Sequence, residues 1–210
     1  MDKTLTELTR KRYDRSAWFY DLCQFPMEHM RLSRWREILW DKVTGRDILE
    51  VGVGTGKNLP LYPKDKTITA IDISPKMLAR AKRKAKSLGI ATRFLEMDVQ
   101  RLEFEENSFD AIVTTFIFCS VPDPVLGLRE LRRVIRPNGH LLMLEHMRPT
   151  NAILGWTFDL INPLVVRITG ANINRETMKN LQRAGWLVKD QTDIFSDFVK
   201  LIEAVPSDTS

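Results

Sequence analysis

The sequence predicts an α/β fold, a doubly wound and mostly parallel sheet of seven strands with an antiparallel C-terminal hairpin and an N-terminal helical lid. Three observations lead to this prediction. Apolar strand-like runs alternate with helical segments through residues 47–147, a glycine-rich turn follows the first run, and the last two runs alternate as antiparallel strands do. A single domain is expected, because 210 residues of which 43% are hydrophobic can form one substantial core.

The N-terminal part, residues 1–43, is expected to be a helical lid that also contacts a membrane, with helix over residues 4–43. Aromatic and basic residues are interleaved there, which suits a membrane interface, since Tyr and Trp settle at the headgroups and Arg and Lys attract anionic lipid. The alternative is that the aromatics cover a ligand cleft and pack on the sheet. The residues concerned are Tyr13, Trp18, Phe19, Tyr20, Phe25, Trp35 and Trp40, and Arg10, Lys11, Arg12, Arg15, Arg31, Arg34 and Arg36.

The main domain, residues 44–205, begins with a buried strand that contains Glu50 and runs into three glycines. Gly52, Gly54 and Gly56 occupy alternate positions, where the lack of a Cβ lets a strand turn sharply into a helix and lets backbone approach a ligand. The dinucleotide fingerprint is G-x-G-x-x-G, whereas here the third glycine comes one residue early. This spacing argues against NAD.

The next two strands each end in an aspartate. Residues 67–71 lead to Asp72, after which Ser74 and Pro75 supply an N-cap and a helix start, and residues 92–97 lead to Asp98. Ligands of open α/β sheets bind at the carboxyl ends of strands, so Asp72 is placed to accept hydrogen bonds from ribose hydroxyls and Asp98 from the amine of adenine. Apolar contact with the rings is expected from Ile73, Met77 and Val99.

The fourth strand, residues 109–115, should bring Thr115 towards the same ligand. Residues 124–135 show a helical period, and the next strand covers residues 140–145. Between them, Arg-Pro-Asn-Gly at residues 136–139 predicts a turn in which Gly139 takes an unusual backbone angle.

The C-terminal part begins with residues 148–171, expected to be an insertion on the substrate side. Its apolar stretch, residues 153–168, is interrupted by Asp159, Pro163 and Arg167 and is too short to span a bilayer. It would be buried, contact a lipophilic substrate or insert shallowly into a membrane. The remaining elements are a helix over residues 172–184, an antiparallel pair at residues 187–193 and 198–204, and a tail at residues 206–210.

Glu50, the three glycines, Asp72, Asp98 and the turn at residues 136–139 together resemble the successive motifs of class I S-adenosylmethionine-dependent methyltransferases, over residues 47–147. The resemblance implies a Rossmann-like fold and S-adenosylmethionine as the cofactor. It also implies that Glu50 organises the methionine end, that the glycine loop lies beneath it, and that Asp72 and Asp98 hold ribose and adenine. Arg-Pro-Asn-Gly departs slightly from the family's more frequent Arg-Pro-Gly-Gly.

Further motifs narrow the resemblance. Residues 12–14, 19–22 and 170–175 resemble small bacterial phospholipid N-methyltransferases and the quinone-biosynthesis methyltransferases, and residues 118–121, 145–146 and 172–176 are similar to membrane-associated thiol methyltransferases. These relatives share a lipophilic or membrane-proximal acceptor. The amine of phosphatidylethanolamine is the acceptor we expect, with a thiol and a quinone ring as alternatives. A non-catalytic protein that binds S-adenosylmethionine and supports a partner is an alternative of another class.

Methyl transfer from a sulfonium is an in-line displacement, so orientation can supply up to about 7 to 11 kcal/mol of the acceleration and little acid-base machinery is obligatory. An amine must still lose its proton before it attacks. His146, at the carboxyl end of a strand, is the candidate for this role, and Tyr20 on the lid can contact a cationic headgroup through its ring face. His140 is expected to be structural and Cys119 to pack as a small apolar residue.

The charge pattern favours an anionic surface as a partner. The net charge is +5, and residues 76–86 carry six Lys and Arg without an acid. Nucleic acid is not expected, because no recognition fold is appended and Val-Pro-Asp-Pro at residues 121–124 does not match the Asn/Asp-Pro-Pro-aromatic signature of base-amino methyltransferases.

Cysteine usage and the N-terminal charges set the expected compartment. The two cysteines, Cys23 and Cys119, form no metal-ligand spacing and no disulfide framework, so no metal is expected. Residues 1–15 are too strongly charged for a cleavable signal peptide. The sequence therefore predicts a cytoplasmic protein, peripheral on the inner face of the membrane.

Overall fold

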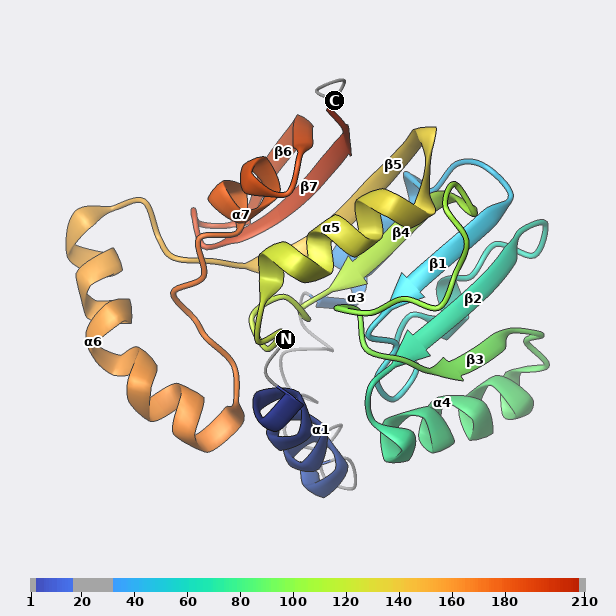
Figure 1. Cartoon of the computed structure of the whole chain (residues 1–210), viewed down its shortest axis with the longest axis horizontal. Helices are drawn as coiled ribbons and strands as arrows, with labels where there is room; N and C mark the ends of the chain where they lie inside the picture. Colours follow the sequence, from blue (N-terminus) through green and yellow to red (C-terminus); the bar gives the residue numbers. More distant parts are fainter. Residues whose placement is uncertain (1–2, 17–31, 208–210) are drawn as a thin grey trace.

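The computed structural model describes residues 3–16 and 32–207 of the chain and contains a seven-stranded sheet of order β3-β2-β1-β4-β5-β7-β6 (Figure 1). Neighbouring strands from β3 to β5 run parallel, and β7 is antiparallel to both β5 and β6. The predicted fold class, including the C-terminal hairpin at the sheet edge, is confirmed. The strands are β1 Asp47–Val51, β2 Thr67–Asp72, β3 Arg93–Glu96, β4 Phe109–Thr115, β5 Ile135–His146, β6 Trp186–Phe195 and β7 Val199–Pro206.

Helices cover both faces of this sheet, as a doubly wound fold requires. They are α1 Lys3–Ser16, α3 Ser33–Asp41, the short 3-10 helix η2 Leu59–Leu61, α4 Pro75–Leu88, α5 Pro124–Val134, α6 Ala152–Thr169 and α7 Thr177–Arg183. In Figure 1, α5 and α7 lie in front of the sheet and α3 lies behind it, whereas α6 stands to one side of the sheet. None of the helices in the described part of the chain combines the length and apolar character needed to cross a bilayer.

The core follows the two-residue alternation of the strands. On one face, Leu49 and Ile112 pack with Leu128 of α5; on the other, Ile48 and Val113 pack with Leu39 of α3. All of these side chains are fully buried. Because consecutive strand residues point to opposite faces, the strands of the sheet have to be apolar almost throughout, which is why the sequence shows continuous apolar runs rather than an alternating pattern.

Helix α4 begins where the sequence predicts. The hydroxyl of Ser74 accepts a hydrogen bond from the N–H of Met77 at 3.1 Å, and Pro75 follows as the first helical residue. Asp123 and Pro124 start α5 in the same way, with a bond from the N–H of Leu126 at 3.0 Å. Both helices therefore start at the carboxyl-end edge of the sheet, beside the predicted ligand residues.

Two expected helices differ from the prediction: one is shorter, and a 3-10 helix stands in place of the other. The helix expected from residue 172 begins at Thr177, because residues 172–175 bond instead to a neighbouring loop, starting with Asn172 N–H to Cys119 C=O at 2.9 Å. The glycine turn leads into η2 and not into an α-helix; Pro60 lies within this short 3-10 helix and Pro63 follows soon after it.

The backbone of Gly139 also differs from the prediction. Its φ is not positive, so the unusual backbone angle predicted for it is wrong. Residues 136–139 belong to β5, in a register shift opposite Asp110 of β4. A Cβ at Gly139 would lie 2.7 Å from the carbonyl oxygen of Asp110 and 2.6 Å from Cγ1 of Ile135. Glycine is needed here for the close approach of two strands.

We therefore expect Gly139→Ala to lower the free energy of unfolding by about 1 to 3 kcal/mol, because a strand backbone atom cannot move aside for the new methyl group. Urea denaturation measures this change. The matched control is Asn138→Ala, whose side chain is exposed and whose effect should stay within about 0.5 kcal/mol. Equal stability of the two variants would contradict the close approach.

Candidate active site

A pocket opens at the carboxyl ends of β1, β2 and β4, between α1 and the loop of residues 116–122. The pocket holds Gly52, Gly54, Asp72, Ile73, Met77, Asp98, Val99 and Thr115, which are eight of the ten cofactor-site residues predicted from the sequence. Glu50 and Gly56 do not line it. The other lining residues are Thr9, Tyr13, Val51, Ile71, Met97, Phe116, Ile117, Ser120, Val121 and Pro122.

The glycine loop forms one wall of this pocket. Gly52 and Gly54 have φ of +74° and +56°, in the left-handed region that glycine adopts without strain. A Cβ at Gly54 would find no atom closer than 4.0 Å, so the space above this residue is open. Gly56 serves packing instead, because a Cβ there would lie 2.4 Å from Cδ1 of Leu59 in η2.

Asp72 ties the glycine loop to the start of α4. Its Oδ2 accepts a hydrogen bond from Gly54 N–H at 2.8 Å, and its Oδ1 accepts one from Ser74 N–H at 2.9 Å. Burial raises the pKa of Asp72 to about 6. Each carboxylate oxygen can accept more than one bond, so the group can still bind a hydroxyl in the pocket.

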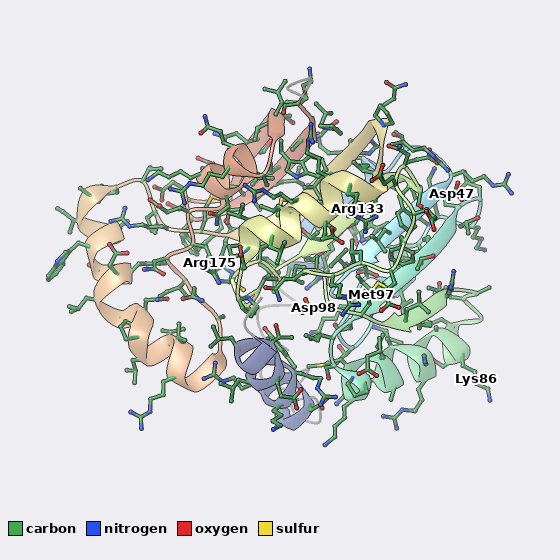
Figure 2. The ribbon with its side chains drawn as sticks, viewed as in Figure 1. Asp47, Lys86, Met97, Asp98, Arg133 and Arg175 are labelled. Atoms are coloured by element: carbon green, nitrogen blue, oxygen red, sulfur yellow. The ribbon has the colours of Figure 1, made fainter. Side chains whose placement is uncertain are left out.

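Asp98 is held by a glutamine that sequence reasoning missed. Gln100 donates to Asp98 from its N–H at 2.9 Å and from Nε2 at 3.0 and 3.1 Å, and its Oε1 accepts from the N–H of Asp123 at 2.9 Å. Asp98 lies at the end of the sheet that faces α1 (Figure 2). The side chain of Gln100 thereby joins the predicted adenine acid to the start of α5.

Glu50 lies beneath the pocket, in a polar network. One carboxylate oxygen accepts from Asn58 Nδ2 at 2.6 Å and the other from the hydroxyl of Tyr62. Asn58 also donates to Thr115 Oγ1 at 3.1 Å, and Thr115 lines the pocket. Burial raises the pKa of Glu50 to about 7. Glu50 therefore reaches the pocket through Asn58 and Thr115; no sequence motif pointed to Asn58 or Tyr62.

A second buried glutamate, Glu145, supports the loop of residues 116–122. Its Oε1 accepts hydrogen bonds from the N–H groups of Ile117 at 3.0 Å and Phe118 at 3.2 Å. Phe116, with φ of +55°, begins this turn. Burial raises the pKa of Glu145 to about 7. The sequence brought attention to this residue only as the neighbour of His146, and its bonds hold the wall formed by Phe116 and Ile117.

The same loop is bonded from outside by residues 172–175. Asn172 donates from N–H and Nδ2 to the carbonyl of Cys119 at 2.9 and 3.1 Å. Arg175 donates to the carbonyls of Val121 at 2.6 Å and Phe118 at 3.2 Å, and Figure 2 shows it beside the start of α5. The motif at residues 170–175 was noticed in the sequence without a role; the structure places it as a brace for the pocket wall.

Helix α1 lies across the opening. The hydroxyls of Tyr13 and Ser120 are 2.6 Å apart, and Ser74 Oγ donates to Asp14 Oδ1 at 2.6 Å. Thr6 Oγ1 donates to Asp98 Oδ2 at 3.4 Å. This part of the N-terminal segment covers the pocket as expected of a lid, whereas Tyr20 lies outside the described residues.

The candidate base, His146, ends β5 as predicted but is not among the lining residues. Its ring packs against that of Phe116 at a centroid distance of 6.0 Å. Burial lowers the pKa of His146 to about 4, so the ring is neutral near pH 7, and its Nε2 has no partner within residues 3–16 and 32–207. His140 Nδ1 lies 3.4 Å from Thr44 Oγ1, which suits a structural role.

Two further candidates can be placed. Cys119 is buried, and its burial raises the pKa of the thiol to about 12, so it packs as an apolar residue and not as a nucleophile. In the part of the chain that the structure describes, no cluster of three or more His, Cys, Asp or Glu is arranged to hold a metal ion.

The raised pKa of Glu145 predicts a pH dependence of stability. Its pKa is about 7 in the folded chain and 4.5 ordinarily, so its contribution to stability is full below about pH 4.5 and is lost as pH rises through about 7. Gln cannot ionise. The stability of Glu145→Gln relative to the unchanged chain should therefore rise by about 2 to 3 kcal/mol between pH 5 and pH 8 in urea denaturation. Exposed Glu103→Gln is the control; a Glu145→Gln difference that does not vary with pH would refute a buried carboxylate.

Comparisons with known proteins identify the family of the chain. Residues 49–143 match a family described as a methyltransferase domain. The chain is 39% identical to a phosphatidylethanolamine N-methyltransferase of Cereibacter sphaeroides over 49% of this chain and 51% of that protein, so it spans about half the length of this relative. It is 33% identical to a demethylmenaquinone methyltransferase of Thermus thermophilus over 74% of this chain and 73% of that protein.

The fold also agrees. A solved structure of an S-adenosylmethionine-dependent methyltransferase from Aquifex aeolicus matches 85% of this chain and 92% of its own, with a TM-score of 0.64 at 19% identity. The demethylmenaquinone methyltransferase of T. thermophilus is aligned with this chain over about three quarters of both proteins, and its identity of 33% is high enough to establish the family. The chain therefore belongs to the class I S-adenosylmethionine-dependent methyltransferases, and S-adenosylmethionine is its cofactor.

Proposed function

We propose that this methyltransferase acts on a lipophilic acceptor at a membrane, with the amine of phosphatidylethanolamine as the substrate. The observation that carries the proposal is the division of the pocket into two walls. Asp72 and Asp98 lie at the ends of β2 and β3, whereas the wall beyond β4 is formed mainly by apolar residues. That wall comprises Phe116, Ile117, Val121 and Pro122. A pocket with two acids on one side and an apolar surface on the other suits a nucleoside beside a lipid.

The residues of the acidic wall fit the cofactor. Asp72 would hold the ribose hydroxyls, and Asp98 the adenine amine, with Ile73, Met77 and Val99 against the rings. Gly54 leaves room for close approach of the methionine end, and Thr115 would contact it. At Gly52 the space is taken by Ile117, whose Cγ2 would lie 2.1 Å from a Cβ there. Glu50 would support the cofactor site indirectly, because it fixes Asn58, which in turn bonds to Thr115.

The bound cofactor supplies an electrophilic methyl group, and this chain's contribution is orientation. The loop of residues 116–122 is fixed by Glu145 from beneath and by Asn172 and Arg175 from outside, so an acceptor packed on Phe116 and Ile117 meets a rigid surface. Helix α1 lies over the pocket, where the hydroxyl of Tyr13 bonds to that of Ser120. Alignment of this kind provides most of what an in-line displacement requires.

The catalytic residues predicted from the sequence remain predictions. His146 is neutral near pH 7 and could take a proton; it does not line the pocket, but its ring packs against that of Phe116, which does. For Tyr20 we keep the proposed contact with a cationic headgroup.

Three relatives bear on the acceptor. The phosphatidylethanolamine N-methyltransferase of C. sphaeroides is the more similar in identity, which supports an amine. The demethylmenaquinone methyltransferase of T. thermophilus is aligned over a longer part of the chain, which favours a quinone ring as the second candidate. A thiol is the third candidate, because the chain is also 31% identical to a thiol S-methyltransferase of Homo sapiens, over 65% of this chain and 58% of that protein. We further propose a cytoplasmic enzyme, peripheral on the inner membrane face, in keeping with its net charge of +5.

The assignment of Asp72 predicts that Asp72→Ala weakens the binding of S-adenosylhomocysteine at least tenfold, because a hydrogen bond to a charged group is worth about 1.5 to 3 kcal/mol. Isothermal titration calorimetry measures this, with circular dichroism to confirm folding. The control is Asp65→Ala, whose side chain is 81% exposed. In the unchanged chain, affinity should fall as pH drops through about 6 and Asp72 becomes protonated. Equal affinity of the Asp72→Ala variant would reject the ribose role.

The acceptor is tested by transfer of radiolabelled methyl groups from S-adenosylmethionine. Label should enter the lipid fraction with vesicles that contain phosphatidylethanolamine, and not with vesicles of phosphatidylcholine, whose nitrogen has no free valence. Demethylmenaquinone and an alkyl thiol in detergent micelles are tested in parallel. Label in the quinone or the thiol alone would overturn the amine assignment, and no label with any of the three would overturn the lipophilic acceptor.

A further inference from the structure

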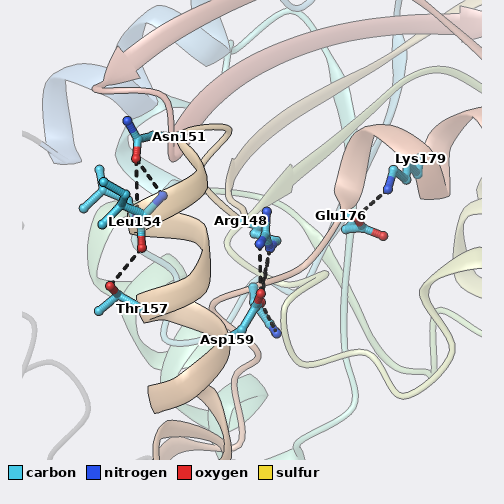
Figure 3. A network of polar contacts seen from close by, with 9 residues as sticks. Arg148, Asn151, Leu154, Thr157, Asp159, Glu176 and Lys179 are labelled. Atoms are coloured by element: carbon cyan, nitrogen blue, oxygen red, sulfur yellow. Dashed lines mark hydrogen bonds and ion pairs between the residues drawn. The ribbon is translucent and has the colours of Figure 1, made fainter.

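Helix α6 is amphipathic in the reverse sense to that of most helices in globular proteins. Its polar side faces the rest of the chain: Asp159 accepts from Arg148 Nη2 at 2.8 Å and from Asn174 Nδ2 at 3.0 Å, and Asn162 Oδ1 accepts from the N–H of Ile173 at 2.9 Å. Figure 3 shows Asp159 and Arg148 pointing towards each other. The side of the helix opposite these bonds is exposed.

That outer side is a stripe of large apolar residues. Ile153, Trp156, Leu160 and Leu164 recur at intervals of three and four residues and therefore share one face of the helix. Their exposed fractions are 76%, 64%, 64% and 62%. A continuous apolar stripe of this size marks a surface that binds something, because it is costly to leave in water. The burial that the sequence allowed for this stretch is not what the structure shows.

We propose that this stripe is a membrane-docking surface, which inserts into the headgroup region of a bilayer containing anionic lipid. This inference rests on the proposed lipophilic acceptor for its purpose, but its physical basis is separate. An interfacial helix lies in the membrane plane with Trp and Leu on the buried side and its polar side turned away, and α6 presents that arrangement. Asn151 caps it, accepting from Ile153 and Leu154 N–H (Figure 3).

The charges beside α6 select an anionic partner. The exposed Arg167 lies in the last turn of α6, and Arg12 of α1 lies against Gly170, at the end of the same helix. Helix α4, which adjoins α1, adds the exposed residues Lys76 and Lys82 and contains no acid. In Figure 1 the end of α6, α1 and α4 follow one another along one side of the molecule. Basic groups next to an apolar stripe attract anionic lipid.

A second copy of the chain is the other occupant that an apolar stripe could have. In a two-fold dimer through α6, the same patch meets itself, so the basic groups of both copies would be brought together. The net charge of +5 per chain opposes that contact, whereas it favours an anionic bilayer.

The position of α6 also suits delivery of a lipid to the pocket. The helix ends at Gly170, and Asn172 and Arg175, directly after it, are the residues that brace the loop of residues 116–122. The end of α6 is thereby joined to the pocket wall on which we propose that the acceptor packs.

The test is cosedimentation of the whole chain with vesicles of phosphatidylcholine and phosphatidylglycerol, without cofactor or acceptor. Trp156→Ser/Leu160→Ser should reduce partitioning at least tenfold. The matched control is Ile38→Ser/Leu187→Ser, which removes exposed apolar residues from α3 and β6 and should leave partitioning within twofold. Brominated lipid should quench the fluorescence of the unchanged chain, and Trp156→Phe should remove most of that quenching while binding persists. Unchanged calorimetric affinity for S-adenosylhomocysteine confirms that the α6 variant is folded.

Equal partitioning of the α6 variant and the control would overturn the inference, as would quenching that does not depend on Trp156. It would also be overturned if light scattering shows a dimer of the unchanged chain and a monomer of the α6 variant, while both bind vesicles equally. The proposed function fails separately. If the unchanged chain binds vesicles through Trp156 yet methylates no lipophilic acceptor, the docking surface stands and the acceptor assignment falls.

Discussion

Three carboxylates at the ends of parallel strands, of which Glu50 and Glu145 are buried and Asp72 is half-buried, hold the loops that make up the pocket. Asp72 on β2 bonds the glycine loop to α4, Glu50 on β1 fixes Asn58 and Thr115, and Glu145 on β5 fixes the turn after β4. Burial raises the pKa of each. Buried carboxylates are costly unless loop N–H groups and side chains satisfy them, so the loops have little freedom to move away. The rigid wall proposed to orient the acceptor depends on this constraint.

Much of the scaffold could be predicted from the sequence, because local signals agreed with the tertiary structure. Residues 67–72 show both a buried strand and the acid that ends it, and Ser74 with Pro75 fixes the start of α4 to the residue. The antiparallel pair at the C-terminus was predicted within a few residues. Gly139 was misjudged because the reason for glycine there is a carbonyl on another strand, which no local pattern contains.

The supporting residues of the site escaped prediction for the same physical reason. Gln100, Glu145 and Arg175 act through bonds to backbone groups of residues distant in the sequence, and each residue type is common at solvated positions. His146 was placed correctly at the end of β5, but the sequence does not show that its ring packs against Phe116 and does not line the pocket. Ligand-contacting residues directly follow the ends of strands, so they can be predicted from the sequence. The residues that support them depend on tertiary packing, which the sequence does not show.

The weak attachment of α1 affects how the cofactor can enter and leave the pocket. The contacts described between α1 and the pocket rim are polar, as between Tyr13 and Ser120 or Asp14 and Ser74, and the helix contributes no residue to the buried core clusters. Such bonds exchange readily with water, each with a small net free energy. Detachment of α1 can therefore admit fresh cofactor and release the spent one while the sheet stays intact.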